Sequence, residues 1–204
     1  MVEELERLKS ILLHMTSHIN RVVDATAKLF RESNLDKRKE MWREIDETSA
    51  LLEKIRRDFV NEVLIFMARR QPLGRELLIA HTLINIAYDV YRISRYCREI
   101  ARIDFMLAPD SGVAAIQGFD SVFGEAANAV RNALNDLTGF KPSNEQIIAE
   151  IDSRIDERYK SLLKIVSMKD SVGRIEALGI LVMRHIERIV DHANYIEGYL
   201  KDIV

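Results

Sequence analysis

Apolar residues recur at steps of three and four along most of the chain, which is the spacing of amphipathic α-helices. The final segment shows this most regularly, with apolar positions at Val182, Ile186, Ile189, Ala193, Ile196 and Leu200. The segment before it has apolar positions at Ile148, Ile151, Ile155, Leu162 and Val166, with Tyr159 filling the gap. Alternating steps of four and three place such residues on one seam of a helix. We therefore expect two helices that pack through these seams.

Interruptions of this pattern divide the chain into six predicted helices. The residue before a proline disfavours helix, so Pro72 marks one boundary. The stretch at residues 108–112, Ala-Pro-Asp-Ser-Gly, is the clearest break. The predicted helices cover residues 3–32, 35–70, 73–107, 113–137, 143–168 and 172–204, and Ser143 or Asn144 is expected to cap the fifth. Long helices with short links are expected to pack as antiparallel neighbours.

Short matches between the two halves of the chain indicate a tandem duplication. The tripeptide Ile-Asp-Glu at residues 45–47 recurs at residues 155–157, an offset of 110. The dipeptide Arg-Ile at residues 92–93 recurs at residues 188–189, an offset of 96. We predict an all-α fold of two tandem, antiparallel three-helix bundles, at residues 1–108 and 112–204.

Composition agrees with a helical protein and argues against several kinds of partner. The chain has 8 glycines and 3 prolines in 204 residues, too few for the many turns of a β-rich fold. A net charge of -2 provides no basic excess for binding nucleic acid. The lone Cys97 cannot form an intrachain disulfide, the N-terminus is charged, and no apolar run approaches the ~18 residues of a membrane span. We therefore expect a cytoplasmic protein without a membrane span.

Four acidic residues in the last two predicted helices form the strongest candidate site. Asp152 and Asp156 are four residues apart, as are Glu187 and Asp191, and each follows a seam position by one residue. A step of one residue turns about 100° around a helix. On antiparallel helices whose seams face each other, that turn carries both pairs to the same side. We predict that the four carboxylates converge along one edge and hold a hard cation, which prefers oxygen ligands.

A plainer interpretation of these acids stays open, and catalysis is not expected. Arg184 and Arg188 lie three residues before Glu187 and Asp191, so the acids could instead form surface ion pairs. The sequence has no Gly-rich phosphate loop and no linear Ser, Cys or His nucleophile motif. The Glu-x-x-His motifs of di-iron bundles are also missing, which argues against a metal-dependent enzyme of that class.

The segment at residues 187–196, Glu-Arg-Ile-Val-Asp-His-Ala-Asn-Tyr-Ile, closely resembles a signature of the PhoU family. That family carries Glu-Arg-Ile-Gly-Asp-His-Ala near the end of each three-helix repeat, and Val190 here replaces the usual small residue. Residues 70–77, Arg-Gln-Pro-Leu-Gly-Arg-Glu-Leu, resemble the turn that opens the third helix of the first repeat. Asp46 and Asp156 resemble the aspartates of the second helix in each repeat. The resemblance covers essentially the whole chain.

The resemblance implies an all-α fold of two three-helix repeats and a regulatory role rather than an enzymatic one. PhoU-like proteins repress phosphate uptake together with the phosphate-specific ABC transporter and a sensor kinase. The implied partners are therefore the transporter ATPase, the sensor kinase or both, with consequences for phosphate homeostasis and signalling, and a homodimer or other homo-oligomer is implied as well. The alternatives are a metal-binding helical protein and an accessory regulator of another transporter or ion channel.

Some family members hold multinuclear iron or zinc clusters through Glu/Asp-x-x-x-Asp motifs, which supports a metal site in the second repeat. The corresponding set in the first repeat is degenerate and comprises Trp42, Asp46, Asp89, Tyr91 and Arg95. Tyr91 and Arg95 stand at the positions of Glu187 and Asp191, and an arginine opposes a cation. We therefore expect any divalent, iron or zinc ion in the second repeat only.

Overall fold

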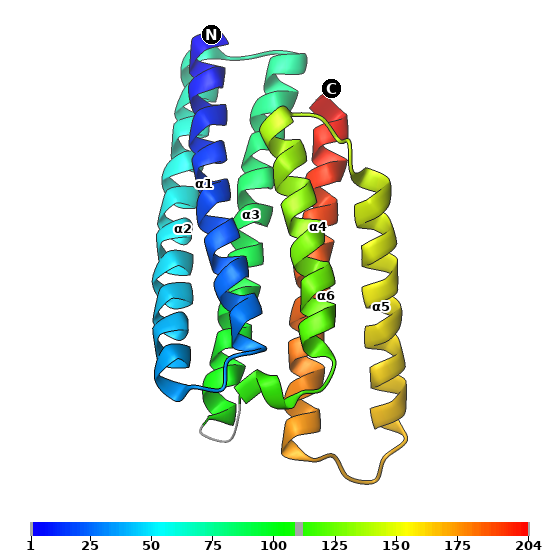
Figure 1. Ribbon diagram of the computed structural model, residues 1–204. Helices are drawn as coiled ribbons and strands as arrows, with labels where there is room; N and C mark the ends of the chain where they lie inside the picture. The colour runs from blue at the N-terminus through cyan, green and yellow to red at the C-terminus, as the bar shows by residue number, and fades with distance from the viewer. Residues whose placement is uncertain (1, 109–111, 204) are drawn as a thin grey trace.

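Long α-helices joined by short connections make up the computed structural model, which describes residues 2–108 and 112–203 (Figure 1). The helices are α1 (Val2–Leu29), α2 (Leu35–Arg70), α3 (Arg75–Leu107), α4 (Phe119–Gly139), α5 (Glu145–Ser167) and α6 (Arg174–Ile203). A short 3-10 helix, η1 (Gly112–Ala115), precedes α4. No strand occurs in the described residues, so the predicted all-α class is confirmed.

Local sequence explains where the helices begin and end. The side chain of Asn34 caps α2 by accepting hydrogen bonds from the backbone N–H groups of Asp36 and Lys37. Gln71, just before Pro72, adopts a left-handed conformation and ends the same helix. The predicted bounds of α2 are therefore confirmed. The predicted start of α4 is wrong. The predicted helix at residues 113–137 is interrupted at Gly118, whose φ of 81° lies in the left-handed region.

The predicted seam of α6 is confirmed, and that of α5 only in its first half. All six seam residues of α6, from Val182 to Leu200, are fully buried. On α5, Ile148, Ile151 and Ile155 are buried, but Leu162 is only partly covered. The later turns of α5 border an open cavity beside α4, which accounts for this difference.

Helices α3 and α6 form the most extensive helix pair, with α1 and α2 packed on α3, and α4 and α5 packed on α6 (Figure 1). The buried apolar residues of the two halves belong to one continuous core. The predicted division at residues 1–108 and 112–204 thus separates the first three long helices from the last three. That each half is an independent folding unit stays a prediction. The predicted break at residues 108–112 falls partly outside the described residues, although α3 does end at Leu107.

A buried ion pair holds the start of the second half. Asp104 accepts hydrogen bonds from Arg38 Nε at 3.0 Å, from Trp42 Nε1 at 2.6 Å and from the backbone N–H of Val113 at 2.7 Å. Gly112 has a φ of 62°, and a Cβ added there would lie 1.8 Å from a guanidinium nitrogen of Arg38. The backbone conformation and the close approach of Arg38 therefore require a glycine at this position. Among the described residues, no helix combines the length and apolar character needed to cross a membrane.

Candidate functional site

Helices α5 and α6 bring the four predicted acids to one edge of the molecule. Asn194 of α6 donates a hydrogen bond to Asp152 of α5 at 3.1 Å, which ties the two helices together at this edge. Burial raises the pKa of Asp152, and repulsion from Asp191 and Asp156 adds to the rise. The negative charges of Asp191 and Asp156 are therefore near enough to oppose the ionisation of Asp152.

Cationic side chains accompany three of these carboxylates. Arg184 donates to Glu187 at 2.6 Å, and Arg188 donates to Asp191 at 2.8 Å. Lys160 lies one turn after Asp156 and donates to it at 2.5 Å. The pKa of Glu187 is nevertheless raised, because its burial and the charge of Asp191 oppose ionisation, and the two arginines counter this rise. Surface ion pairing, the alternative interpretation of these acids, therefore describes the contacts of three of the four carboxylates.

The donor set as arranged does not fit a metal ion. Within residues 2–108 and 112–203, no three His, Cys, Asp or Glu side chains are grouped closely enough to hold one. One oxygen of Glu187 is buried without a hydrogen-bond partner, but its other oxygen already accepts from Arg184. A bound cation would have to displace these arginines. Metal binding at this edge stays a prediction.

The degenerate set predicted for the first half does not form one cluster, because Asp89 is separated from the other members. Asp46 accepts a hydrogen bond from Arg98 at 2.5 Å, and Trp42 lines the same pocket on the edge formed by α2 and α3. Tyr91 is buried, and hydrogen bonding to its oxygen raises the pKa of Arg95. Asp89, expected nearby, lies elsewhere, because its position on α3 faces α6 rather than α2.

Asp89 forms a buried contact between the two halves, which sequence reasoning missed. His192 Nδ1 lies 2.6 Å from Asp89 Oδ1, and the imidazole stacks on Tyr96 at a centroid distance of 5.6 Å. Burial raises the pKa of Asp89, and the histidine counters the rise. A signal was present in the sequence, because Asp89 occupies the seam of α3 between Ile86 and Ile93. An acid at such a position requires a partner from another helix.

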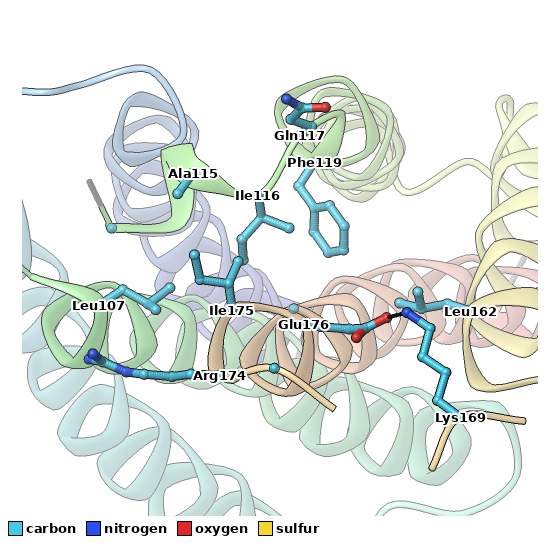
Figure 2. Close-up of a pocket in the computed structure, with 13 residues that line it drawn as sticks. Leu107, Ala115, Ile116, Gln117, Phe119, Leu162, Lys169, Arg174, Ile175 and Glu176 are labelled. Carbon is cyan, nitrogen blue, oxygen red and sulfur yellow. Dashed lines mark hydrogen bonds and ion pairs between the residues drawn. The ribbon is translucent and has the colours of Figure 1, made fainter. Parts of the chain in front are cut away.

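A cavity of about 880 Å³ opens at the end of the bundle where the two halves are connected (Figure 2). Its lining is mainly apolar, with Ile116 from the connection, Phe119 from the start of α4 and Ile175 from the start of α6. An ion pair between Lys169 and Glu176 stands at its border, as the dashed line in Figure 2 marks. Nothing in this lining resembles a nucleophile with its base, so the cavity can offer contact area but no evident bond-making chemistry.

A second opening of about 630 Å³ adjoins the first between α4 and α5, because Phe119 and Leu162 line both. Large apolar side chains are also exposed around this end of the bundle. They include Phe105, Met106, Ile165, Met168 and Ile175. Exposed apolar area of this kind, gathered in one region, is typical of surfaces that contact another molecule.

Comparison with known proteins finds similarity to one family. A model of the PhoU domain matches residues 12–103. The PhoU homologue of Synechocystis sp., named as a phosphate-specific transport system accessory protein, is 22% identical over 99% of this chain and 90% of that protein. The homologue with the same name from Pseudomonas putida is 28% identical over 95% of this chain and 76% of that protein. The chain is therefore similar to proteins of the PhoU family over nearly its whole length.

Solved structures agree with this similarity at the level of the fold. The crystal structure of PhoU from Pseudomonas aeruginosa matches with a TM-score of 0.81 at 21% identity, and the match covers 97% of this chain and 95% of that one. PhoU from Streptococcus pneumoniae matches with a TM-score of 0.79 at 18% identity, over 97% and 93% of the two chains. The six-helix PhoU fold therefore extends beyond the matched domain at residues 12–103 to nearly the whole chain.

Proposed function

We propose that this PhoU-like chain is an accessory regulator of phosphate uptake that acts in the cytoplasm by binding another protein. The observation that carries the proposal is the relationship, over nearly the full length, to homologues named as accessory proteins of the phosphate-specific transport system. Binding requires no bond-making step, in keeping with the apolar lining of the main cavity. The partners that fit this role are the ATPase of the transporter and the sensor kinase. A homodimer of the chain fits the same role when its interface leaves the apolar end accessible.

Disruption of the gene tests the role directly. Loss of a repressor should leave phosphate uptake high when external phosphate is abundant, and the wild-type gene should restore repression. Affinity purification of the tagged chain should recover the transporter ATPase or the kinase. Unchanged uptake together with no recovery of either protein would refute the proposal.

The apolar end of the bundle is where we place the contact with the transporter ATPase. Ile175 lines the main cavity and is 48% exposed, so Ile175→Asp should weaken binding of the ATPase without disturbing the core. Leu73 offers a matched control, since it is 82% exposed in the connection between α2 and α3, at the opposite end of the bundle (Figure 1). If Ile175→Asp and Leu73→Asp weaken binding of the ATPase equally, the apolar end is not the contact surface.

Metal binding at the acidic edge is a second candidate role. Burial is the main cause of the raised pKa of Asp152, and repulsion from Asp191 and Asp156 adds to it; this repulsion is the observation in favour of the role, because a cation would relieve it. Elemental analysis of protein purified without chelators measures occupancy. The variant Glu187→Ala/Asp191→Ala should lose the metal, while Asp36→Ala/Glu40→Ala, a pair with the same spacing on α2, should keep it. Wild-type protein that carries no metal after incubation with iron, zinc or manganese would exclude this role.

A further inference from the structure

A separate pocket of about 340 Å³ lies on the edge formed by α2 and α3, in the first half of the chain. Trp42 and Arg43 reach it from α2, and Arg98, Arg102 and Phe105 reach it from α3. Its size falls at the lower end of the ~300–1,000 Å³ range of small-molecule sites. None of these residues belongs to the acidic edge, and only Phe105 is also counted among the exposed side chains at the apolar end of the bundle.

Two aromatic rings stand at fixed positions in this pocket. The indole N–H of Trp42 is bonded to buried Asp104 at 2.6 Å, which holds the ring in one orientation. Phe105 meets the indole edge to face, with ring centroids 5.1 Å apart and an interplanar angle of 81°. Phe105 is nevertheless 64% exposed. The pocket therefore presents an ordered indole beside a phenyl ring that retains apolar surface for another planar group.

Positive charge surrounds these rings. Three guanidinium groups, from Arg43, Arg98 and Arg102, line the pocket against the single carboxylate of Asp46. Asp46 engages Arg98 at 2.5 Å, and Glu99 engages Arg102 at 3.0 Å. Arg43 is exposed and has no ion pair or hydrogen bond to any side chain in the described parts of the chain. A local excess of arginine on a chain of net charge -2 favours an anion.

We propose that this pocket binds a small organic phosphate that carries a planar ring, the chemical class of nucleotides. The ring would stack against Phe105 and Trp42, as bases do on aromatic side chains. The phosphate groups would be held by Arg43 with help from Arg98, because a guanidinium matches phosphate oxygens in a bidentate geometry. A metal ion is disfavoured by the same arginines, and a purely apolar ligand would leave Arg43 without a partner. The inference goes beyond the proposed regulatory role and does not depend on it.

The fluorescence of Trp42 provides a direct readout, because Trp42 is the single tryptophan of the chain. Titration with adenosine diphosphate should change the emission in a saturable way, and calorimetry should give the same dissociation constant. Adenosine lacks the charge and inorganic phosphate lacks the ring, so each should bind at least about tenfold more weakly. No saturable binding of the diphosphate at millimolar concentration would overturn the proposal. Inorganic phosphate that binds as tightly as the diphosphate would overturn the role of the rings.

Two exposed residues separate the contributions of charge and stacking without disturbing the fold. Arg43→Glu should weaken binding of adenosine diphosphate at least about tenfold, because it replaces an attractive charge with a repulsive one. Arg57→Glu is the matched control, since Arg57 is an exposed arginine about 21 Å further along the same helix. Phe105→Ala should weaken the diphosphate about tenfold and leave inorganic phosphate unchanged. Equal effects of Arg43→Glu and Arg57→Glu would show that binding occurs elsewhere.

Discussion

The two halves of the chain treat equivalent edges in opposite ways. On the α5–α6 edge, acids dominate and take their cations mostly from the same helix, as Asp156 does with Lys160. On the α2–α3 edge, arginines and aromatic rings dominate, and Asp46 takes its cation from the neighbouring helix at Arg98. In both halves the helices are held by buried seams rather than by these edges. Edge residues can therefore differ in chemistry between the two halves without affecting the packing of the helices.

The buried acids of the two halves differ as well. Asp104 is fully buried with Arg38 and accepts three hydrogen bonds. Glu197 of α6 is also fully buried, but its two carboxyl oxygens have no hydrogen-bond partner in the described residues, and its acidic neighbour is Asp136. The first half thus neutralises the charge of Asp104 with a cation, whereas the raised pKa of Glu197 predicts that this acid in the second half stays neutral by retaining a proton.

Removal of Asp104 should cost the most stability. Asp104→Ala leaves the guanidinium of Arg38 buried without its counter-charge and removes the acceptor for Trp42 and Val113. A broken buried ion pair costs about 3–5 kcal/mol of the free energy of unfolding. Urea unfolding followed by circular dichroism measures this loss. Asp46→Ala, which removes a half-exposed acid on the same edge, should cost less than about 1 kcal/mol, and equal losses would contradict the anchoring role of Asp104.

Gly112→Ala should be the next most destabilising change. The new Cβ would lie 1.8 Å from a nitrogen of Arg38 and 2.1 Å from an oxygen of Asp104, at a φ of 62°. Strain and overpacking together should cost about 2–4 kcal/mol. Gly118→Ala separates the two causes, because Gly118 also has a positive φ but no atom within 4 Å of an added Cβ. Thermal unfolding of both variants should show the smaller loss, about 1 kcal/mol, for Gly118→Ala.

Sequence alone predicts the helices and their seams but not how charged residues are paired. The bounds of α2 follow from Asn34 and Pro72, which act on adjacent residues. The partner of Asp104 is 66 residues away at Arg38, and a spacing pattern within one helix carries no information about such a contact. At the acidic edge, a spacing of three or four suits both ion pairing and shared ligation, so the pattern could not distinguish them. The break at Gly118 was missed because helical periodicity continues on both sides of it.

Glu197→Gln should stabilise the protein in a pH-dependent manner. Burial and the nearby charge of Asp136 raise the pKa of Glu197 from 4.5 to about 8, so the folded state holds a proton that the unfolded chain releases above pH 4.5. Wild-type stability should therefore fall as the pH rises from 4.5 towards 8. Glutamine has no proton to lose, so its advantage should grow over this range to about 1–3 kcal/mol. Melting temperatures measured across this pH range check the trend.

The exposed Glu157 provides the control for this pH dependence. Glu157→Gln lies on the surface of α5, so it should leave the stability profile unchanged. A profile for Glu197→Gln that runs parallel to that of the wild type would show that Glu197 is ionised in the folded protein. The second half would then contain a buried charge without a cation, and the contrast with Asp104 would lie in stability rather than in protonation.

The smallest expected effect concerns the two matched surface acids. A double-mutant cycle for Asp46 and Arg98 should give a coupling of about 0.5–1 kcal/mol, because this pair joins two helices and Arg98 is mostly covered. The equivalent cycle for Asp156 and Lys160 should give a smaller coupling, about 0.2–0.5 kcal/mol, since Lys160 is exposed and the two residues lie one turn apart on one helix. Added salt should reduce the first coupling, because these charges are only partly shielded from solvent. A larger coupling for Asp156 and Lys160 would mean that the acidic edge, rather than the aromatic one, is the more tightly organised of the two.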